Sequence, residues 1–365
     1  MSKKKHEPKF HIAKRDALDW WKSWLIRICA VAAALIVCAL VTVVLTGENP
    51  IGVYVKMFEG AFGTKRRIWS LVQNIAMLLC VSLAVTPAFK MRFWNIGAEG
   101  QVLAGGLATA ACMILFGNKL PSVALYALMV ITSCLAGAVW AVIPAFFRAN
   151  WKTNETLFTL MMNYIAIQLV SYIWSVPKGS GQIGVINQST RSGWMPSLGG
   201  YDYLLNILVV AGLTVFMFVY LRSSKQGYEI SVVGESENTA RYVGIDVKKV
   251  IIRTMLLSGA ICGIAGLLLV SGTDHTITRD TAAGRGFTAI MVSWLAKFNP
   301  LYMVLTSFLI VFLQKGAIEI STTFGLNSSF SDILTGIIIF FIIGSEFFIN
   351  YTIKVHNSKK GEKES

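Results

Sequence analysis

Charged residues are scarce in this sequence of 365 residues. Only 14% are Asp, Glu, Lys or Arg, whereas 55% are hydrophobic, and the 19 acidic residues are outnumbered by 33 basic ones. Soluble domains have about a quarter of their residues charged. The scarcity argues against an ordinary soluble domain and favours a membrane protein.

Motifs for covalent chemistry and for metal binding are also missing. The sequence has no HExxH, no nucleophile elbow and no pair of carboxylates at catalytic spacing. It has no GxxxxGK[ST] either, so any ATP hydrolysis belongs to another polypeptide. His275 beside Asp274 is weak evidence for a metal site, and a solvated loop is the simpler interpretation. We therefore expect no catalytic residue, no metal and no cofactor on this chain.

The cysteines show no redox or metal-binding spacing. None forms a CxxC, and all lie within apolar runs, where each behaves as a small apolar side chain. They are Cys29, Cys38, Cys80, Cys112, Cys134 and Cys262.

Basic residues are concentrated in three segments. Eight precede the first apolar run, six lie between Arg222 and Arg253, and four follow Ile353. Short segments rich in Lys and Arg stay in the cytoplasm, so we place all three segments there. A nucleic-acid partner would need a folded basic face with stacking aromatics, and none is expected.

Long apolar runs indicate the fold class. About 20 apolar residues cross a ~30 Å hydrocarbon core as a helix. The prediction is an all-α polytopic membrane helical bundle of about ten spans, with both termini cytoplasmic and with two short or interrupted helices. The spans are expected at 25–46, 68–88, 93–116, 122–147, 155–175, 203–221, 251–271, 284–298, 300–320 and 331–350.

The domain organisation follows from these runs. Residues 1–24 are a basic, amphipathic cytoplasmic segment, in which tryptophans of a helix over Phe10 to Arg27 anchor at the headgroups. Residues 25–350 form the transmembrane domain, with a cytoplasmic loop at 222–250, and residues 351–365 are a basic cytoplasmic tail. One feature conflicts with this topology, because the basic residues 65–67 fall in a loop that it places outside.

Two of the ten spans are poor. Residues 284–298 would be only ~22 Å long as a helix. The span that starts near Phe93 holds four glycines around Glu99 and Gln101. Paired interrupted helices, one in each half of a transporter, indicate a binding site near the middle of the membrane.

Polar residues in these spans have two readings each. An ionisable side chain in hydrocarbon must face protein, water or a partner charge, so Asn95, Glu99 and Gln101 either line a passage or fix the broken helix beside it. Equally, Glu99 caps freed amides of a glycine-broken helix. Asn163 either lines the passage or bonds across helices. The spacing Gly259-x-x-x-Gly263 favours close helix packing.

The loop at 227–245 is too long and too patterned for a simple hairpin. Ser236 or Glu235 can cap a short helix, and Gly244 can end it. With FWNIGAEGQ at 93–101 and ETLFTLMMNYIA at 155–166, this stretch, GYEISVVGESENTARYVGI, resembles the branched-chain-type permease subunits of bacterial ABC importers. The resemblance is strongest to the nucleoside and simple-sugar group, and it covers residues 25 to 350.

The resemblance implies a coupling helix that docks on a separate ABC ATPase, which binds the ATP and Mg²⁺. It also implies a second, different permease subunit, an extracytoplasmic substrate-binding lipoprotein, and a multi-pass place in the lipids of the bacterial cytoplasmic (inner) membrane. The residues expected to couple to the ATPase are Glu235, Glu237, Ala240, Arg241 and Gly244.

Nucleosides, purine nucleosides above all, are the cargo that the resemblance implies. Amides and rings suit a neutral nucleoside, because a base offers a face to stack on and several groups to hydrogen-bond. Trp94 offers a further ring. The residues expected to line the pathway are Phe93, Asn95, Glu99, Gln101, Asn163, Phe287 and Trp294.

Three alternatives stay open. One is a permease for a simple sugar in the same ABC class. A second is an ion-coupled secondary transporter, which needs embedded carboxylates and has only Glu99, Glu319 and Glu346 to offer. A third is an assembly protein without a passage.

Overall fold

The computed structural model describes residues 10–15, 18–47, 49–175 and 184–355. The ends of both predicted cytoplasmic segments lie outside these residues. The chain forms two compact units. Met1–Arg67 and Phe312–Ser365 make one, called here the terminal unit, and Ile68–Val311 make the other, the central unit.

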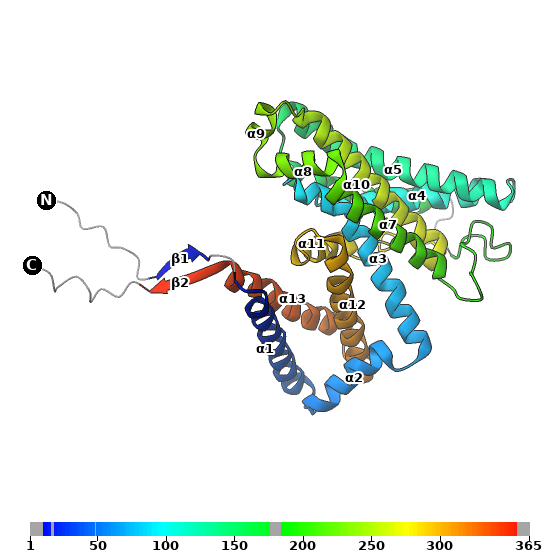
Figure 1. Ribbon diagram of the computed structural model, residues 1–365. Coiled ribbons are helices and arrows are strands. Elements are labelled where there is room, and N and C mark those ends of the chain that lie inside the picture. The colour runs from blue at the N-terminus through cyan, green and yellow to red at the C-terminus, as the bar shows by residue number, and fades with distance from the viewer. Residues whose placement is uncertain (1–9, 16–17, 48, 176–183, 356–365) are drawn as a thin grey trace, which may run out of the picture. The chain divides into compact units, whose positions relative to one another are not determined.

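Helices dominate the described residues, which confirms the predicted all-α membrane bundle (Figure 1). In chain order the elements are β1 (Phe10–Lys14), α1 (Trp20–Thr46), α2 (Pro50–Phe62), α3 (Lys65–Lys90), α4 (Ala98–Phe116), α5 (Ser122–Trp151), α6 (Glu155–Ser175), α7 (Leu204–Ser223), α8 (Lys225–Glu235), α9 (Glu237–Tyr242), α10 (Val247–Leu269), the π-helical turn η1 (Val270–Asp274), α11 (Arg285–Leu295), α12 (Pro300–Thr323), α13 (Ser328–Asn350) and β2 (Tyr351–Val355).

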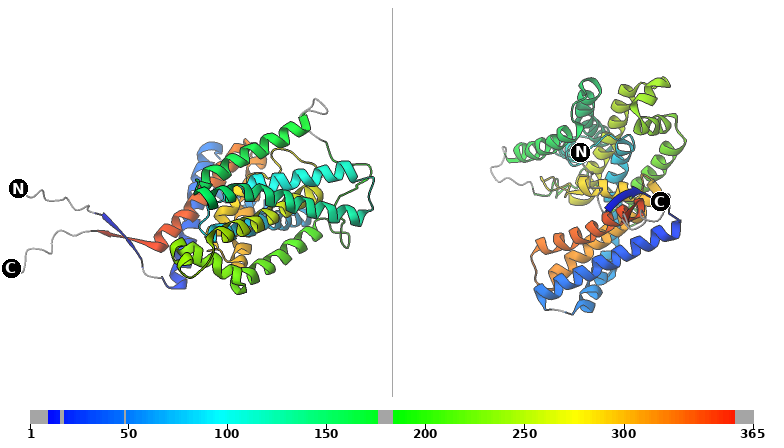
Figure 2. Two further views of the ribbon diagram at one scale, coloured as in Figure 1. Left: turned by 90° about the horizontal axis from the view of Figure 1, so that it is seen from above. Right: turned by 90° about the vertical axis from the view of Figure 1, so that its left-hand side faces the viewer.

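The terminal unit brings the two ends of the chain together. Helices α1 and α13 lie side by side, and β1 pairs with β2 as an antiparallel ribbon from Phe10 opposite Val355 to Lys14 opposite Tyr351 (Figures 1 and 2). The predicted helix over Phe10 to Arg27 is therefore wrong in its first part, since the helix begins at Trp20. The ribbon hydrogen-bonds backbone N–H and C=O groups that would lack a partner at a frayed helix end. It also puts residues 10–14 and 351–355 on the same side of the membrane, which requires an even number of crossings between them.

An ion pair within the terminal unit accounts for Arg67, one of the three basic residues at 65–67. The guanidinium of Arg67 donates to the Glu319 carboxylate at 2.8 Å and to the backbone oxygen of Glu59 at 2.8 Å. Arg27 pairs in the same way with Glu346 at 2.5 Å. Because Arg67 has a partner in its own unit, its position need not follow the charge rule for cytoplasmic loops.

Nine helices in the described part of the chain are long and apolar enough to cross a membrane. An even total then needs a tenth crossing that is not one long helix. The segment that contains α11 fits this form, because its eleven residues measure only ~16 Å and follow turns at 275–284. The prediction of a short helix here is confirmed.

Helix α10 is the centre of the central unit and packs against α5 and α4. A Cβ on Gly259 would lie 2.3 Å from the backbone oxygen of Gly137, and one on Gly263 would lie 2.1 Å from that of Ser133. Real side chains cannot enter such gaps, so glycine lets the two backbones touch. The structural reading of the GxxxG spacing is thereby confirmed.

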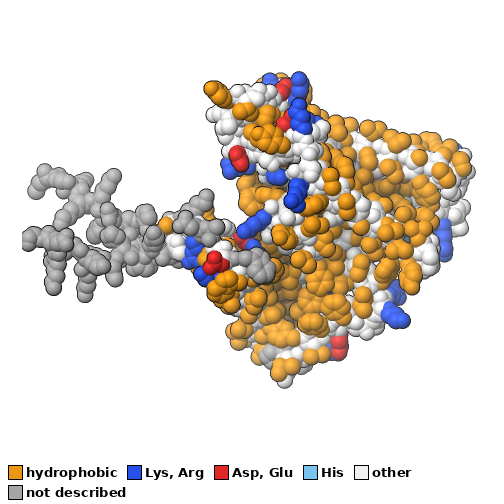
Figure 3. Space-filling view, in the orientation of Figure 1, with side chains coloured by type: hydrophobic (Ala, Val, Ile, Leu, Met, Phe, Trp, Pro, Cys, Tyr) orange, Lys and Arg blue, Asp and Glu red, His pale blue; other side chains and the backbone are white. Residues whose placement is uncertain are grey.

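The surface side chains of the central unit are distributed as in a membrane protein. Lys and Arg gather over α8 and α9, while the visible face of the neighbouring helices is largely hydrophobic (Figure 3). Val139 on α5 and Ile165 on α6 are among the exposed apolar side chains of this unit. A continuous apolar surface of this kind is suited to lipid or to another subunit.

Candidate functional site

The chain breaks its helical course between α3 and α4. Residues 91–97 are non-helical, and the Asn95 side chain holds them in shape. Its Oδ1 accepts from the Gly97 amide at 3.0 Å and from Gln101 Nε2 at 3.1 Å, and its Nδ2 donates to Ser258 Oγ at 3.4 Å. Ser258 is the twelfth residue of the 28-residue apolar segment Val247–Asp274, so the break reaches the middle of the bundle.

Helix α6 fastens the same break from its other side. Asn163 Nδ2 donates to the Ile96 oxygen at 2.8 Å, and its Oδ1 accepts from the Gly100 amide at 2.8 Å. Thr159 Oγ1 accepts from the Ile96 amide at 3.2 Å. The structure thus places Asn95, Gln101 and Asn163 in one buried network that satisfies the backbone of a broken helix.

Glu99 joins α4 to α11. Its carboxylate accepts hydrogen bonds from the amides of Gly284 at 2.7 Å and Gly286 at 2.8 Å, and only 7% of the residue is exposed. These amides begin α11 and have no partner within that helix. Glu99 therefore caps a helix, as one of its two readings expected, but the helix is α11 and not its own.

Two helix N-termini consequently meet at Glu99. Helix α4 starts at Ala98, one residue before it, and α11 starts at Arg285. The N-terminus of a helix attracts anions because its amides and its dipole present positive charge. Here the carboxylate of the chain itself occupies the anion position of α11.

A second polar group lies beside this junction, and the sequence analysis did not find it. The Arg285 guanidinium donates to Asn74 Oδ1 at 3.2 Å and to the backbone oxygen of Thr281 at 3.3 Å. Its charge is close enough to interact with both Glu99 and Asp274. A basic residue at the start of a short apolar run was the only signal for it.

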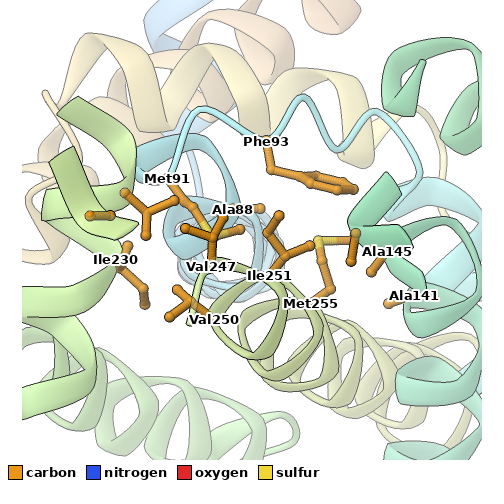
Figure 4. Packing of buried hydrophobic residues seen from close by; sticks show 13 residues of the cluster. Ala88, Met91, Phe93, Ala141, Ala145, Ile230, Val247, Val250, Ile251 and Met255 are labelled. Atoms are coloured by element: carbon orange, nitrogen blue, oxygen red, sulfur yellow. The ribbon is translucent and has the colours of Figure 1, made fainter. Parts of the chain in front are cut away.

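Aromatic side chains form an open cluster next to the break. The rings of Trp94 and Trp294 lie 5.7 Å apart and are 46% and 49% exposed, with Phe89 and Phe298 packed against them. Phe287 is also exposed. Phe93 points the other way, into the core beside Ile251 and Met255 (Figure 4). Neighbouring residues of an extended segment face opposite sides, so Trp94 presents the ring that was expected of Phe93.

The loop predicted to be cytoplasmic folds into α8 and α9. Ser236 Oγ accepts from the Thr239 amide at 3.2 Å and caps α9, as expected. Gly244, at φ +84°, ends it in a Schellman motif, in which the Ile245 amide donates to the Ala240 oxygen at 2.9 Å.

Ala240 is fully buried against the bundle, whereas Tyr242, the last residue of α9, is 93% exposed. Ala240 therefore anchors the helix, and the outward face belongs to Arg241, Tyr242 and Val243. Glu235 also lies exposed, at the end of α8. Tyr242 was not among the residues predicted from the sequence. Residues two positions apart in a helix face nearly opposite sides, so its position relative to Ala240 was a usable signal.

Arg148 connects α9 to the transmembrane helices. It lies at the end of α5 and pairs with Glu155 at the start of α6 at 3.2 Å and with Glu237 on α9 at 3.6 Å. Thr159, one turn further along α6, donates to the Glu155 oxygen and also bonds the broken segment. Contacts thus run without interruption from α9 to the mid-bundle break.

The opposite end of α10 is tied to the loop at 184–203. His275 stacks on Trp194 at 3.8 Å, and the Met195 amide donates to the Ser271 oxygen at 3.0 Å. Asp274, Arg279 and Asp280 are exposed, as expected of a solvated loop, but the His275 ring is packed. Burial lowers the pKa of His275 below its usual value.

Comparison with known proteins gives a family match. The model of the family described as "Branched-chain amino acid transport system / permease component" matches residues 67–343. The glucose ABC transporter permease protein TsgB13 of Haloferax volcanii is 30% identical, over 95% of this chain and 94% of its own. The guanosine ABC transporter permease protein NupP of Bacillus subtilis is 31% identical, over 88% and 93%.

Two further relatives carry related names. The nucleoside ABC transporter permease protein NupB of Lactococcus lactis is 29% identical, over 81% of this chain and 84% of its own. A second guanosine ABC transporter permease protein of Bacillus subtilis, NupQ, is 25% identical, over 57% and 67%.

Proposed function

The chain belongs to the branched-chain amino acid transport system permease family, and from that premise we propose that it forms the passage for nucleosides, purine nucleosides first, in an ATP-binding-cassette importer. The family membership makes it a multi-pass transport subunit and not an enzyme. The cargo, the partners and the bacterial cytoplasmic membrane are the proposal.

Charge at the helix junction supports a neutral cargo. A free carboxylate or phosphate would need a cationic partner in the passage, and the N-terminus of α11 is the natural one. Glu99 already occupies it with two hydrogen bonds. An anionic cargo would therefore meet a like charge, whereas a nucleoside or a sugar would not.

The single observation that carries the choice of a nucleoside is the open aromatic pair. Trp94 and Trp294 present exposed rings beside the junction. Stacking of a base on an aromatic side chain contributes about 1–3 kcal/mol. The names of NupP, NupQ and NupB point to the same cargo.

Glucose is the second candidate cargo. TsgB13 matches this chain over as much of its length as any of the relatives above. Sugars also stack on aromatic rings, but they offer no flat π-face, so the Trp pair favours a base over a hexose.

The proposed partners follow from the same features. Arg241, Tyr242 and Val243 are exposed at the end of α9. Lys and Arg gather over α8 and α9 (Figure 3), which suits a separate ATPase that carries ATP and Mg²⁺. Two different guanosine permeases in Bacillus subtilis suggest that this chain also works with a second permease. A substrate-binding lipoprotein would deliver the cargo.

An ion-coupled mechanism has little support. It needs a carboxylate free to bind a proton or Na⁺ inside the membrane. Glu99 is held by two amides, Glu319 by Arg67 and Glu346 by Arg27. Each of the three candidates thus already has a partner.

The proposal is tested in proteoliposomes that contain this chain with its second permease and ATPase, supplied with the binding protein. We expect ATP-dependent accumulation of labelled guanosine, inhibited by excess unlabelled adenosine or guanosine and not by leucine or guanosine monophosphate. Inhibition by glucose alone would assign the second candidate. Accumulation without the ATPase, driven by an ion gradient, would overturn the ABC mechanism.

A further inference from the structure

We propose that Asp274 and Arg285, braced by Asn74, bind a vicinal pair of hydroxyl groups on the cargo. The inference rests on the proposed transport function for the identity of that cargo, the ribose of a nucleoside. The residues come from three elements, η1, α11 and α3, and none of them belongs to the buried network around Asn95.

Arg285 is fixed in one orientation. Its Nη1 donates to the Thr281 oxygen at 3.3 Å and to the Ala282 oxygen at 3.5 Å, while its Nη2 donates to Asn74 Oδ1 at 3.2 Å. A guanidinium has five N–H groups in a rigid fork, so three such contacts leave donors over. These remaining donors can bind a cargo oxygen.

Asp274 is the open carboxylate of this group. Its side chain is exposed, and no donor among the described residues reaches it with a hydrogen bond, in contrast to Glu99. Asp274 follows Thr273, which bonds to Gln73, and Gln73 precedes Asn74, the partner of Arg285. Among the described residues no ion pair joins Asp274 to Arg285. A carboxylate at the end of a membrane span must face water or a polar cargo, and its oxygens here are available to accept.

The π-helical turn brings Asp274 to this place. One extra residue per turn changes the direction of the side chains at the end of α10, and such turns are frequent at functional sites. The turn is secured by Gln73, whose Nε2 donates to Thr273 Oγ1 at 2.7 Å. The backbone amide of Met195 donates to the Ser271 oxygen on the same turn.

The chemistry of the group fits two adjacent hydroxyls. An ionised carboxylate accepts from both O–H groups of a vicinal diol, as acidic residues do with ribose in dinucleotide sites. The guanidinium donates to the lone pairs of the same oxygens. The charges of Asp274 and Arg285 balance each other, so a neutral diol replaces water there without a net charge.

Ribose and glucose both carry such hydroxyls, so the experiment separates them. Uptake of labelled guanosine and of 2′,3′-dideoxyguanosine is measured in the complete complex for the unaltered protein, D274N and D274A. The binding protein is the same throughout, so its own preference cancels when the ratios of the two uptakes are compared. We expect the guanosine-to-dideoxyguanosine ratio to fall about tenfold in both variants. The matched control is D280N, since Asp280 is an exposed carboxylate six residues away.

A ratio that stays unchanged while both uptakes fall would give Asp274 a purely structural role and overturn the inference. A second readout does not depend on transport. In a D274C variant, guanosine should protect the thiol from a charged methanethiosulfonate, whereas the thiol of D280C should react at the same rate with and without guanosine. If neither guanosine nor glucose protects the D274C thiol, the inference is overturned. Protection of D274C by glucose and not by guanosine would keep the hydroxyl site and refute the nucleoside cargo instead.

Discussion

The Glu99 carboxylate and the Gly286 amide lie 2.8 Å apart, although 187 residues separate them in the chain. This hydrogen bond, with its companion to Gly284, joins the start of α4 to the start of α11. Two helices thereby start at one carboxylate near the middle of the bundle. Because this carboxylate occupies the helix N-terminus that would otherwise attract an anion, the junction suits an uncharged cargo.

Replacing Glu99 tests the junction. E99A leaves two buried amides without an acceptor, at a cost of about 1–3 kcal/mol each. We expect a lower melting temperature in detergent and loss of uptake, with E99Q intermediate because its amide oxygen can still accept from one of the two. The control is E59Q, which removes an exposed charge whose ion-pair partner among the described residues is Lys56. Full stability of E99A would show that the two amides find other partners.

The open aromatic pair predicts a selective defect. W94A and W294A each remove a stacking face, so guanosine uptake should fall about tenfold, whereas W294F should keep most of it. W21A removes an exposed ring in the terminal unit and should have no effect on uptake. If W94A and W294A transport guanosine normally, these rings do not meet the base.

Coupling to the ATPase should depend on the outward face of α9. Y242D adds a charge to a side chain that is already exposed, so the protein should fold while uptake and permease-dependent ATP hydrolysis fall together. Y201D places the same change on an exposed tyrosine of the loop at 184–203 and serves as the control. Full activity of Y242D would exclude this face as the docking surface.

Ala240 should behave differently from Tyr242. A240R forces a charge into the core cluster of Ile230, Val247 and Met255, where an unpaired charge costs several kcal/mol. We expect little of this variant in the membrane fraction, measured by an antibody against a tag. A stable but uncoupled A240R would mean that the residue reaches the partner directly.

His275 predicts a dependence of stability on pH. Burial lowers the pKa of the folded-state imidazole below the ~6.5 of an unfolded chain. Asp202 opposes this shift and Arg191 adds to it. The stabilisation is therefore complete above about pH 6.5 and is lost as the pH falls through the lowered folded-state value.

The melting temperature should fall from pH 7.5 to 5 by more in the unaltered protein than in H275F. Phenylalanine retains the ring on Trp194 and cannot take up a proton. Parallel curves for the two proteins would exclude His275 as the source of the acid sensitivity.

Much of the fold was predictable because apolar runs mark membrane helices locally. The short helix at 285–295, the caps at Ser236 and Gly244 and the close packing at Gly259 all follow from nearby residues. The ribbon of β1 and β2 was not predictable, because its partners lie at opposite ends of the chain. The same holds for the basic Arg67, whose partner Glu319 is 252 residues away.

The candidate site was predictable in its residues and not in its contacts. Glu99 was expected to cap a helix, but only the folded chain shows which one. Phe93 and Trp94 differ by one position, and the facing of an extended segment cannot be read from two aromatic neighbours. Arg285 was missed, and Asp274 was considered only with its neighbour His275, because only the fold brings Asp274 and Arg285 near each other.

Sidedness of α9 is the most direct test of the central claim that this chain is the membrane half of an ATP-driven importer. In a Y242C variant, a membrane-impermeant maleimide should label inside-out vesicles and leave intact cells unlabelled above the cysteine background of the unaltered protein. The same thiol should form a cross-link to the ATPase subunit. Labelling from the outside of intact cells would place α9 on the wrong side of the membrane and contradict the account.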